Sequence, residues 1–136
     1  MEFVVQGSRR NRKFCEALLP SLISQLKLTN SRKTLMVSIA AEDGKTHCGY
    51  TMAIPGLEAY VIVIKPVRRL KEIGLTLAHE MVHVSQMASG LLKPAGRGAQ
   101  FWAGKRYAKN TPYLDQPWEQ NAFARTELLF RRAIDS

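Results

Sequence analysis

The sequence is poor in several features that mark common classes of protein. Its 136 residues include only two cysteines, Cys15 and Cys48, which lie in unlike contexts. Such a pair favours buried free thiols over a disulfide framework and fits a reducing cytoplasm. No apolar run reaches about 18 residues, so no membrane span is expected. The first residues lack a cationic start followed by an apolar core, so we expect no secretory signal and a cytoplasmic protein.

Acidic residues are scarce relative to basic ones. Eleven Asp and Glu stand against 20 Lys and Arg, which gives a net charge of +9. A surplus of this size can favour contact with nucleic acid. The basic residues are spread along the chain, however, and no aromatic-interleaved nucleic-acid motif accompanies them. A solvated basic surface is therefore the preferred interpretation, with a nucleic-acid partner as the alternative.

The rest of the composition is ordinary for one globular domain. Apolar residues make up 46% of the chain and charged residues 23%. A chain of this length can bury about two-thirds of its unfolded surface and fold without disulfides or structural metals. We therefore expect a single domain over residues 1–136.

The most informative stretch is His79-Glu80-Met81-Val82-His83, inside a run from Leu75 to Ser89 without glycine or proline. Its many apolar residues predict a buried helix. Residues four apart lie on one face of a helix, so His79 and His83 can share one metal ion. Glu80 lies about 100° round the axis from His79 and flanks the ion. This pattern is typical of zinc hydrolases, in which the carboxylate takes a proton from water.

A catalytic zinc usually needs a third protein ligand. The stretch from Asp115 to Ala122 reads as the start of another helix, with Asp115 as its cap and Pro117 in its first turn. Glu119 falls in this first turn and is the predicted third ligand. Glu127 is the competitor, on nearly the same face but about 12 Å further along the axis, and the helix-start motif favours Glu119.

The histidine pattern can also be explained without a metal ion. The motif can arise by chance, and two stacked histidines can be partly buried residues bonded to the backbone. Its context favours a metal site, because imidazoles without partners would be costly among so many apolar neighbours. Two of the three histidines in the chain belong to the motif.

These residues carry a family resemblance over roughly residues 58–130. The motif from His79 to His83, followed by Glu119 within Pro117-Trp118-Glu119-Gln120-Asn121-Ala122, resembles the gluzincin clan of zinc metallopeptidases. The short chain is similar to the minigluzincins and more loosely to SprT-like proteins. The stretch Gln100–Tyr107, with Tyr113 and Pro117–Glu119, is similar to small phage-encoded metallopeptidase-like proteins, for which the location would be the host cytoplasm.

The resemblance implies a zincin-like α+β fold with one Zn²⁺ ion. It implies His79, His83 and Glu119 as the zinc ligands and Glu80 as the general base. The chain lacks the long C-terminal domain of the larger gluzincins and its histidine donor to the oxyanion. Three functions follow as hypotheses: a zinc peptidase acting on a peptide or protein, a catalytically weak or inactive zinc module for interaction or assembly, and a DNA-associated protease of SprT-like character.

Periodicity predicts three helices on one face of a small, mainly antiparallel sheet of about three to four strands. Pro20 should kink the first helix or divide it in two. Asp43-Gly44 predicts a hairpin turn between the first two strands. The expected helices cover residues 8–28, 67–90 and, after the Asp115 cap, 116–134. Strands are expected over 34–40, 47–54, 58–64 and 99–103, a loop over 91–98 and a helical turn over 105–110.

Four further residues are candidates for a role at the site. His47 and Cys48 are possible metal ligands, but neighbours on a strand point to opposite faces, so we expect a surface histidine and a core cysteine. Tyr107 and Tyr113 are candidate second donors to an oxyanion, although a core position is the simpler role for each. An exposed sheet edge beside the metal could bind an extended peptide as an added strand.

Overall fold

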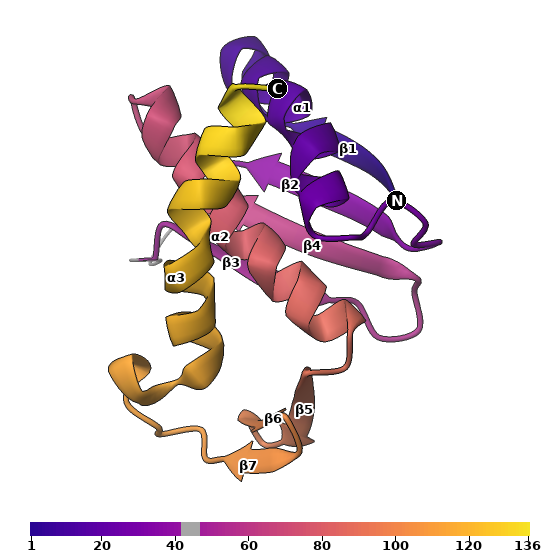
Figure 1. Ribbon diagram of the computed structural model, residues 1–136, viewed down its shortest axis with the longest axis vertical. Helices are drawn as coiled ribbons and strands as arrows, with labels where there is room; N and C mark the ends of the chain where they lie inside the picture. The colour runs from indigo at the N-terminus through magenta and orange to yellow at the C-terminus, as the bar shows by residue number, and fades with distance from the viewer. Residues whose placement is uncertain (42–46) are drawn as a thin grey trace.

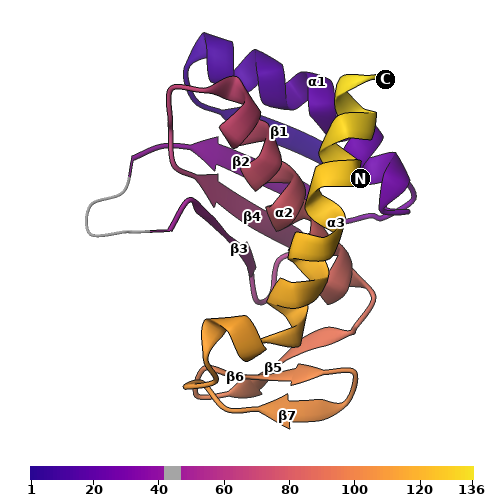
Figure 2. The ribbon, with the colours of Figure 1, turned by 60° about the vertical axis from the view of Figure 1, so that its left-hand side comes forward.

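The computed structural model describes residues 1–41 and 47–136. Two helices lie on one face of a four-stranded sheet and the last helix packs against both of them. A separate three-stranded sheet lies near the first turn of the last helix (Figures 1 and 2). The first sheet comprises β1 (Glu2–Gln6), β2 (Thr34–Ile39), β3 (Gly49–Ala53) and β4 (Ala59–Ile64). The second comprises β5 (Leu92–Gly96), β6 (Ala99–Trp102) and β7 (Lys105–Tyr107). The helices are α1 (Arg9–Gln25), α2 (Leu70–Ala88), the 3-10 turn η1 (Tyr113–Asp115) and α3 (Pro117–Ile134).

The predicted α+β class and helix order are confirmed, but the strand directions differ from prediction. The order of the first sheet is β1-β2-β4-β3, with β1, β2 and β4 parallel and only β3 antiparallel to its neighbour. The sheet is mixed because β1, which was not predicted, is joined to β2 through α1, and such a crossover returns the chain in the same direction. β3 is an edge strand of this sheet.

The hairpin of this sheet lies at Pro55-Gly56, between β3 and β4. Ile54 N donates to Ala59 O at 3.1 Å, and Gly56 has a φ of +78°. Glycine adopts this left-handed conformation without the steric cost that a side chain brings. The predicted turn at Asp43-Gly44 lies outside the described residues.

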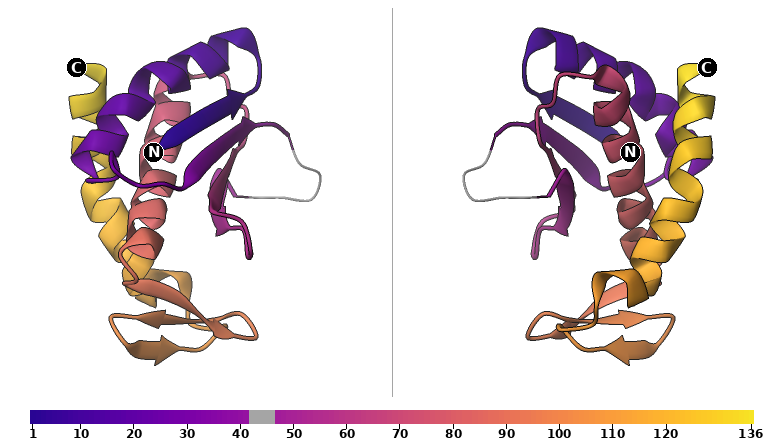
Figure 3. Two further views of the ribbon diagram at one scale, coloured as in Figure 1. Left: turned by 90° about the vertical axis from the view of Figure 1, so that its right-hand side faces the viewer. Right: turned by 90° about the vertical axis from the view of Figure 1, so that its left-hand side faces the viewer.

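The core fills the space between the sheet and the helices (Figure 3). Alternate residues of the parallel strands β2 and β4 point into it, and β4 is apolar on both faces, as expected of a central strand. α1 is one helix, so the prediction of two shorter helices is wrong. Pro20 is exposed, while Leu19 and Leu22 on either side of it are fully buried, and this burial outweighs the local cost of the proline.

α2 carries the histidine motif through the centre of the molecule. It begins at Leu70, later than predicted, and ends at Ala88 with Ser89 as its C-cap, directly before the predicted stop at Gly90, which has a φ of +79°. Gly74 lies inside α2, where a Cβ atom would overlap the ring of Phe130 and meet Phe14 Cε2 at 3.0 Å. This glycine therefore lets α1 and α3 approach α2 closely.

The second sheet replaces two predicted elements. Residues 91–98, predicted as a loop, contain β5, and residues 105–110, predicted as a helical turn, contain β7. The Arg97-Gly98 and Ala103-Gly104 pairs both have positive φ values, which suits tight hairpin turns. α3 begins at Pro117 with Gln116 as its cap, so Asp115 is not the cap but belongs to η1.

None of the helices in the described part of the chain has the length and apolarity needed to cross a bilayer.

Candidate metal centre

The histidine motif forms a compact cluster on α2. One ligand atom from each of His79, Glu80 and His83 lies within 4.8 Å of the others. The two imidazole rings are 5.0 Å apart between centroids and nearly perpendicular. His83 and Glu80 are buried and His79 is partly buried. These three residues lie close enough together to hold a metal ion. The helical spacing predicted this of His79 and His83, with Glu80 beside the ion.

Glu119 reaches the same cluster from the first turn of α3. Its Oε1 lies 2.8 Å from His79 Nε2 and 3.2 Å from His83 Nε2. Glu127, the competing acid, is instead exposed and lies 3.7 Å from Arg131. Of the two acids considered from the sequence, Glu119 is therefore the one beside the histidines.

His83 and Glu119 alter each other's acidity. Burial raises the pKa of Glu119, but hydrogen bonds from His79 and His83 outweigh it and lower the pKa to about 2. Burial lowers the pKa of His83, but its hydrogen bond and charge interaction with Glu119 outweigh this and leave the pKa raised. Glu119 is therefore an ionised acceptor at neutral pH, as a metal ligand must be.

Glu80 is held by a residue that the sequence did not single out. Thr51, on β3, donates from Oγ1 to Glu80 Oε1 at 2.7 Å and to the Glu80 carbonyl oxygen at 3.2 Å. Glu80 is 5% exposed, and this burial raises its pKa although the Thr51 hydrogen bond lowers it. A Cβ at Gly49 would meet Thr76 Cγ2 at 2.8 Å, so glycine allows β3 to lie this close to α2.

Tyr113 is the tyrosine at the cluster. Its hydroxyl donates to Glu119 Oε1 at 3.2 Å, and it is 49% exposed rather than part of the core. Burial of the hydroxyl, followed by the charge of Glu119, raises its pKa to about 12. Tyr107 packs edge-on against Trp118 instead, with ring centroids 5.7 Å apart.

Glu80 and His79 line two cavities. The larger, of about 650 Å³, is lined by all five residues of β3, by the histidines and Glu119, and by Leu92 and Pro94 of the second sheet. No lysine or arginine lines it within the described part of the chain. The other, of about 510 Å³, is lined by residues that include Leu75, Phe123 and Lys71. The cluster is thus open to a ligand that can lie along β3.

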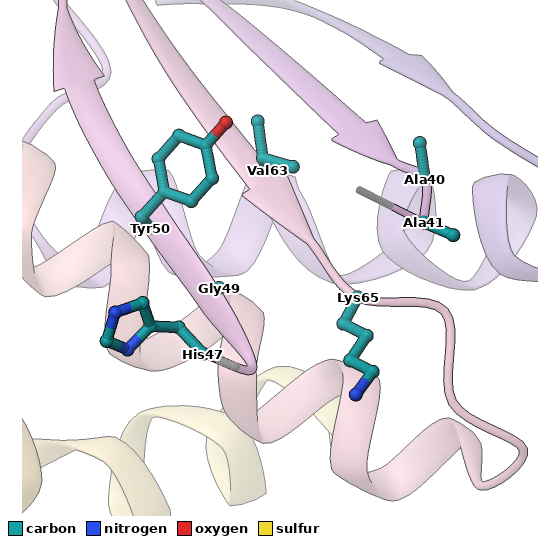
Figure 4. A pocket seen from close by; sticks show the side chains of 7 residues that line it. All are labelled: Ala40, Ala41, His47, Gly49, Tyr50, Val63 and Lys65. Atoms are coloured by element: carbon teal, nitrogen blue, oxygen red, sulfur yellow. The ribbon is translucent and has the colours of Figure 1, made fainter. Parts of the chain in front are cut away.

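His47 and Cys48 lie before β3 and not within it. His47 is exposed, as predicted. Cys48 is a free, exposed thiol, so its predicted core position is wrong; the strand begins at Gly49, and the alternation of its faces does not extend back to residue 48. A small hollow of about 60 Å³ beside His47 and Tyr50 also touches Lys65, as the close-up view shows (Figure 4). The hollow combines one histidine with a lysine and has no set of metal ligands among its described lining residues.

No protein-family model matches this sequence, and no curated protein or solved structure shows significant similarity to it. The interpretation of the cluster therefore depends on its own residues and their geometry, which are compatible with a zincin-like site.

Proposed function

We propose that this protein is a zinc-dependent metallopeptidase. In this proposal His79, His83 and Glu119 bind the ion and Glu80 is the general base. One observation carries the proposal: Glu119 Oε1 lies 2.8 Å from His79 Nε2 and 3.2 Å from His83 Nε2. These contacts bring together residues that are 40 and 36 positions apart in the sequence. Two imidazoles and one carboxylate form a common ligand set of catalytic zinc.

The residues present suit a divalent cation. Two carboxylates, Glu80 and Glu119, face a cavity without lysine or arginine in its described lining. Anionic groups in a partly buried site are stabilised by a nearby positive charge, and a bound cation supplies it. The open cavity also leaves space for water or a substrate beside the ligands.

When bound, a zinc ion supplies Lewis acidity, which polarises a peptide carbonyl and makes water easier to deprotonate. Glu80 Oε1 is occupied by Thr51, so Oε2 is the oxygen that would take the proton from water and pass it to the leaving amine. Like any tyrosine, Tyr113 is protonated at neutral pH, so its hydroxyl could turn from Glu119 and donate to an oxyanion.

The substrate of this proposed enzyme is an extended peptide or protein segment. β3 is an edge strand, and all five of its residues line the cavity beside the histidines. An extended segment can add to such an edge through main-chain hydrogen bonds. This arrangement would hold a peptide bond close to Glu80, which Thr51 of the same strand contacts.

Hydrolysis of a mixture of unstructured proteins by zinc-loaded protein tests the proposal, with Glu80→Gln as the matched variant. We expect the variant to keep its zinc and to lose cleavage by at least about 100-fold, since it keeps its shape but cannot accept the proton. Equal cleavage by both proteins would reject Glu80 as the base. Stoichiometric zinc without cleavage in the parent would favour the alternative, a non-catalytic interaction module.

A second candidate, association with nucleic acid, is favoured by one surface. The starts of α1 and α2 lie side by side, joined by a hydrogen bond from Arg10 Nη2 to the Arg68 carbonyl at 3.0 Å. The surface at this contact is lined by Arg10, Arg68 and Arg69, together with Glu72. Arg9, Lys13 and Lys71, which are close to them in sequence, are also exposed. Binding of single- and double-stranded DNA should then weaken steeply between about 50 and 200 mM salt. The double variant Arg10→Glu/Arg68→Glu should abolish it, whereas Arg97→Glu/Lys109→Glu, on and beside the second sheet, should not.

A further inference from the structure

A buried glutamine connects the two helices that carry the cluster. Gln86 lies on α2, three residues after His83, and is only 2% exposed. A buried primary amide is costly unless its donors and acceptor find partners. Gln86 finds three of them: His83 Nδ1 at 2.8 Å, the Trp118 carbonyl oxygen at 2.9 Å and Asn121 Oδ1 at 2.9 Å.

These partners fix the orientation of the amide. The Trp118 carbonyl oxygen can only accept a hydrogen bond, so it must face the Gln86 NH₂ group. Gln86 Oε1 therefore faces His83, whose Nδ1 must carry the proton that it donates. In the neutral ring this leaves the lone pair on Nε2, where a metal ion could take it. The 3.2 Å contact of Nε2 with the ionised Glu119 is a hydrogen bond only while the ring carries both protons.

The same amide holds the first turn of α3. Trp118 directly precedes Glu119, and Asn121 follows it by two residues. No side chain caps the start of α3, so this turn lacks the usual anchor of a helix N-terminus. Gln86 does not satisfy the N–H groups that a cap would, because it donates hydrogen bonds, but these two bonds tie the turn to α2.

We propose that Gln86 is the positioning residue of this centre, which sets the tautomer of His83 and the place of Glu119 through a single side chain. This inference builds on the proposed function, because His83 and Glu119, which Gln86 would hold in place, are two of the proposed zinc ligands. The other histidine is held less firmly. His79 Nδ1 has a 3.4 Å contact with Thr126 Oγ1, which itself donates to the Ala122 carbonyl oxygen at 2.7 Å.

The test compares Gln86→Met with Gln25→Met in the full chain. Methionine keeps the length of glutamine but makes no such hydrogen bonds. Gln25 is a matched control, because its Nε2 donates to the Leu129 carbonyl oxygen at 3.0 Å and joins α1 to α3 without contacting the histidines. We expect Gln86→Met to bind Zn²⁺ about 10–100-fold more weakly, in competition with a chromogenic chelator, while Gln25→Met binds like the parent.

Three further measurements distinguish positioning from general destabilisation. Gln86→Met should change the visible absorption of the Co²⁺-loaded protein, and Gln25→Met should not. Asn121→Ala, which loosens α3 without touching His83, should weaken Zn²⁺ binding by a smaller factor. Thermal unfolding of the metal-free variants identifies any loss of affinity that arises only from unfolding.

Nitrogen-15 NMR of the histidine rings tests the inference even if the parent binds no metal. We expect His83 Nδ1 to carry a slowly exchanging proton in the metal-free parent, and this proton to exchange rapidly in Gln86→Met. An unprotonated Nδ1 in the parent, or a Zn²⁺ affinity of folded Gln86→Met within about twofold of the parent, would overturn the role of Gln86. Failure of the parent to bind Zn²⁺ would instead reject the proposed function, whatever the NMR result.

Discussion

Thr51 Oγ1 lies 2.7 Å from Glu80 Oε1, so the edge strand β3 holds the carboxylate of α2 across 29 residues of sequence. The contact joins the strand that lines the larger cavity to the proposed general base. A hydrogen bond to one carboxylate oxygen restricts the rotation of the group and leaves the second oxygen to face the cavity. A substrate that adds to β3 would therefore lie on the element that also orients the base.

Thr51→Val should lower the rate of cleavage by about tenfold or more, because a hydrogen bond to a charged group contributes about 1.5–3 kcal/mol. The zinc content should not change, since Thr51 does not contact the histidines or Glu119 in any of its hydrogen bonds. The measurement is kcat at saturating substrate, alongside metal analysis. Thr51→Ser keeps the hydroxyl and should recover most of the rate; a serine variant as slow as valine would contradict the role of the hydrogen bond.

Glu119→Ala should lower Zn²⁺ affinity by at least about 100-fold, beyond the usual effect of residues that only support ligands. Glu127→Ala is the matched control, because Glu127 lies on the same helix but pairs with Arg131 at the surface. Competition with a chromogenic chelator measures both variants at one pH. Equal affinities in the two variants would exclude Glu119 as a ligand.

The sequence predicted the local features of this molecule better than its long-range pairings. The spacing of His79 and His83 fixes their shared helix face, and the pattern around Pro117 predicted the start of α3 to within one residue, although the cap is Gln116 and not Asp115. The parallel pairing of β1 with β2 depends on where α1 returns the chain, and strand periodicity carries no information about direction.

The residues that support the cluster are harder to predict from the sequence. Thr51 reaches Glu80 through the packing of β3 against α2, and nothing in its neighbourhood in the sequence marks it. Gln86 carried a usable signal, because a polar residue among buried apolar ones, one turn from His83, requires a partner. The prediction for Cys48 is wrong because its strand begins at Gly49, two residues later than predicted.

Gly74→Ala should destabilise the protein although alanine favours a helix by about 1 kcal/mol over glycine. The added Cβ would overlap the buried ring of Phe130, and such overpacking costs about 1–3 kcal/mol. Urea unfolding of the metal-free protein measures the change. The double variant Gly74→Ala/Phe130→Leu should recover part of the loss, whereas equal stability of Gly74→Ala and the parent would mean that α2 and α3 are not closely packed at this point.

The two cysteines should differ sharply in acidity and accessibility. Cys15 is fully buried in α1, and burial, with a smaller contribution from the charge of Glu16, raises its pKa from 9.0 to about 12. Above pH 9 the thiol ionises in the unfolded chain but stays neutral in the folded one, so stability falls as the pH rises toward 12. Between pH 8 and 10 the parent should lose about 1 kcal/mol more stability than Cys15→Ala, which lacks the titrating group.

Urea unfolding of both proteins at the two pH values measures this difference, and the subtraction removes the effects of lysine and tyrosine titration. In the native protein a thiol reagent at neutral pH should modify the exposed Cys48 rapidly and Cys15 only at the rate of unfolding. A parallel loss of stability in parent and variant, or equal reactivity of the two thiols, would mean that Cys15 is not shielded as the packing of α1 against the sheet requires.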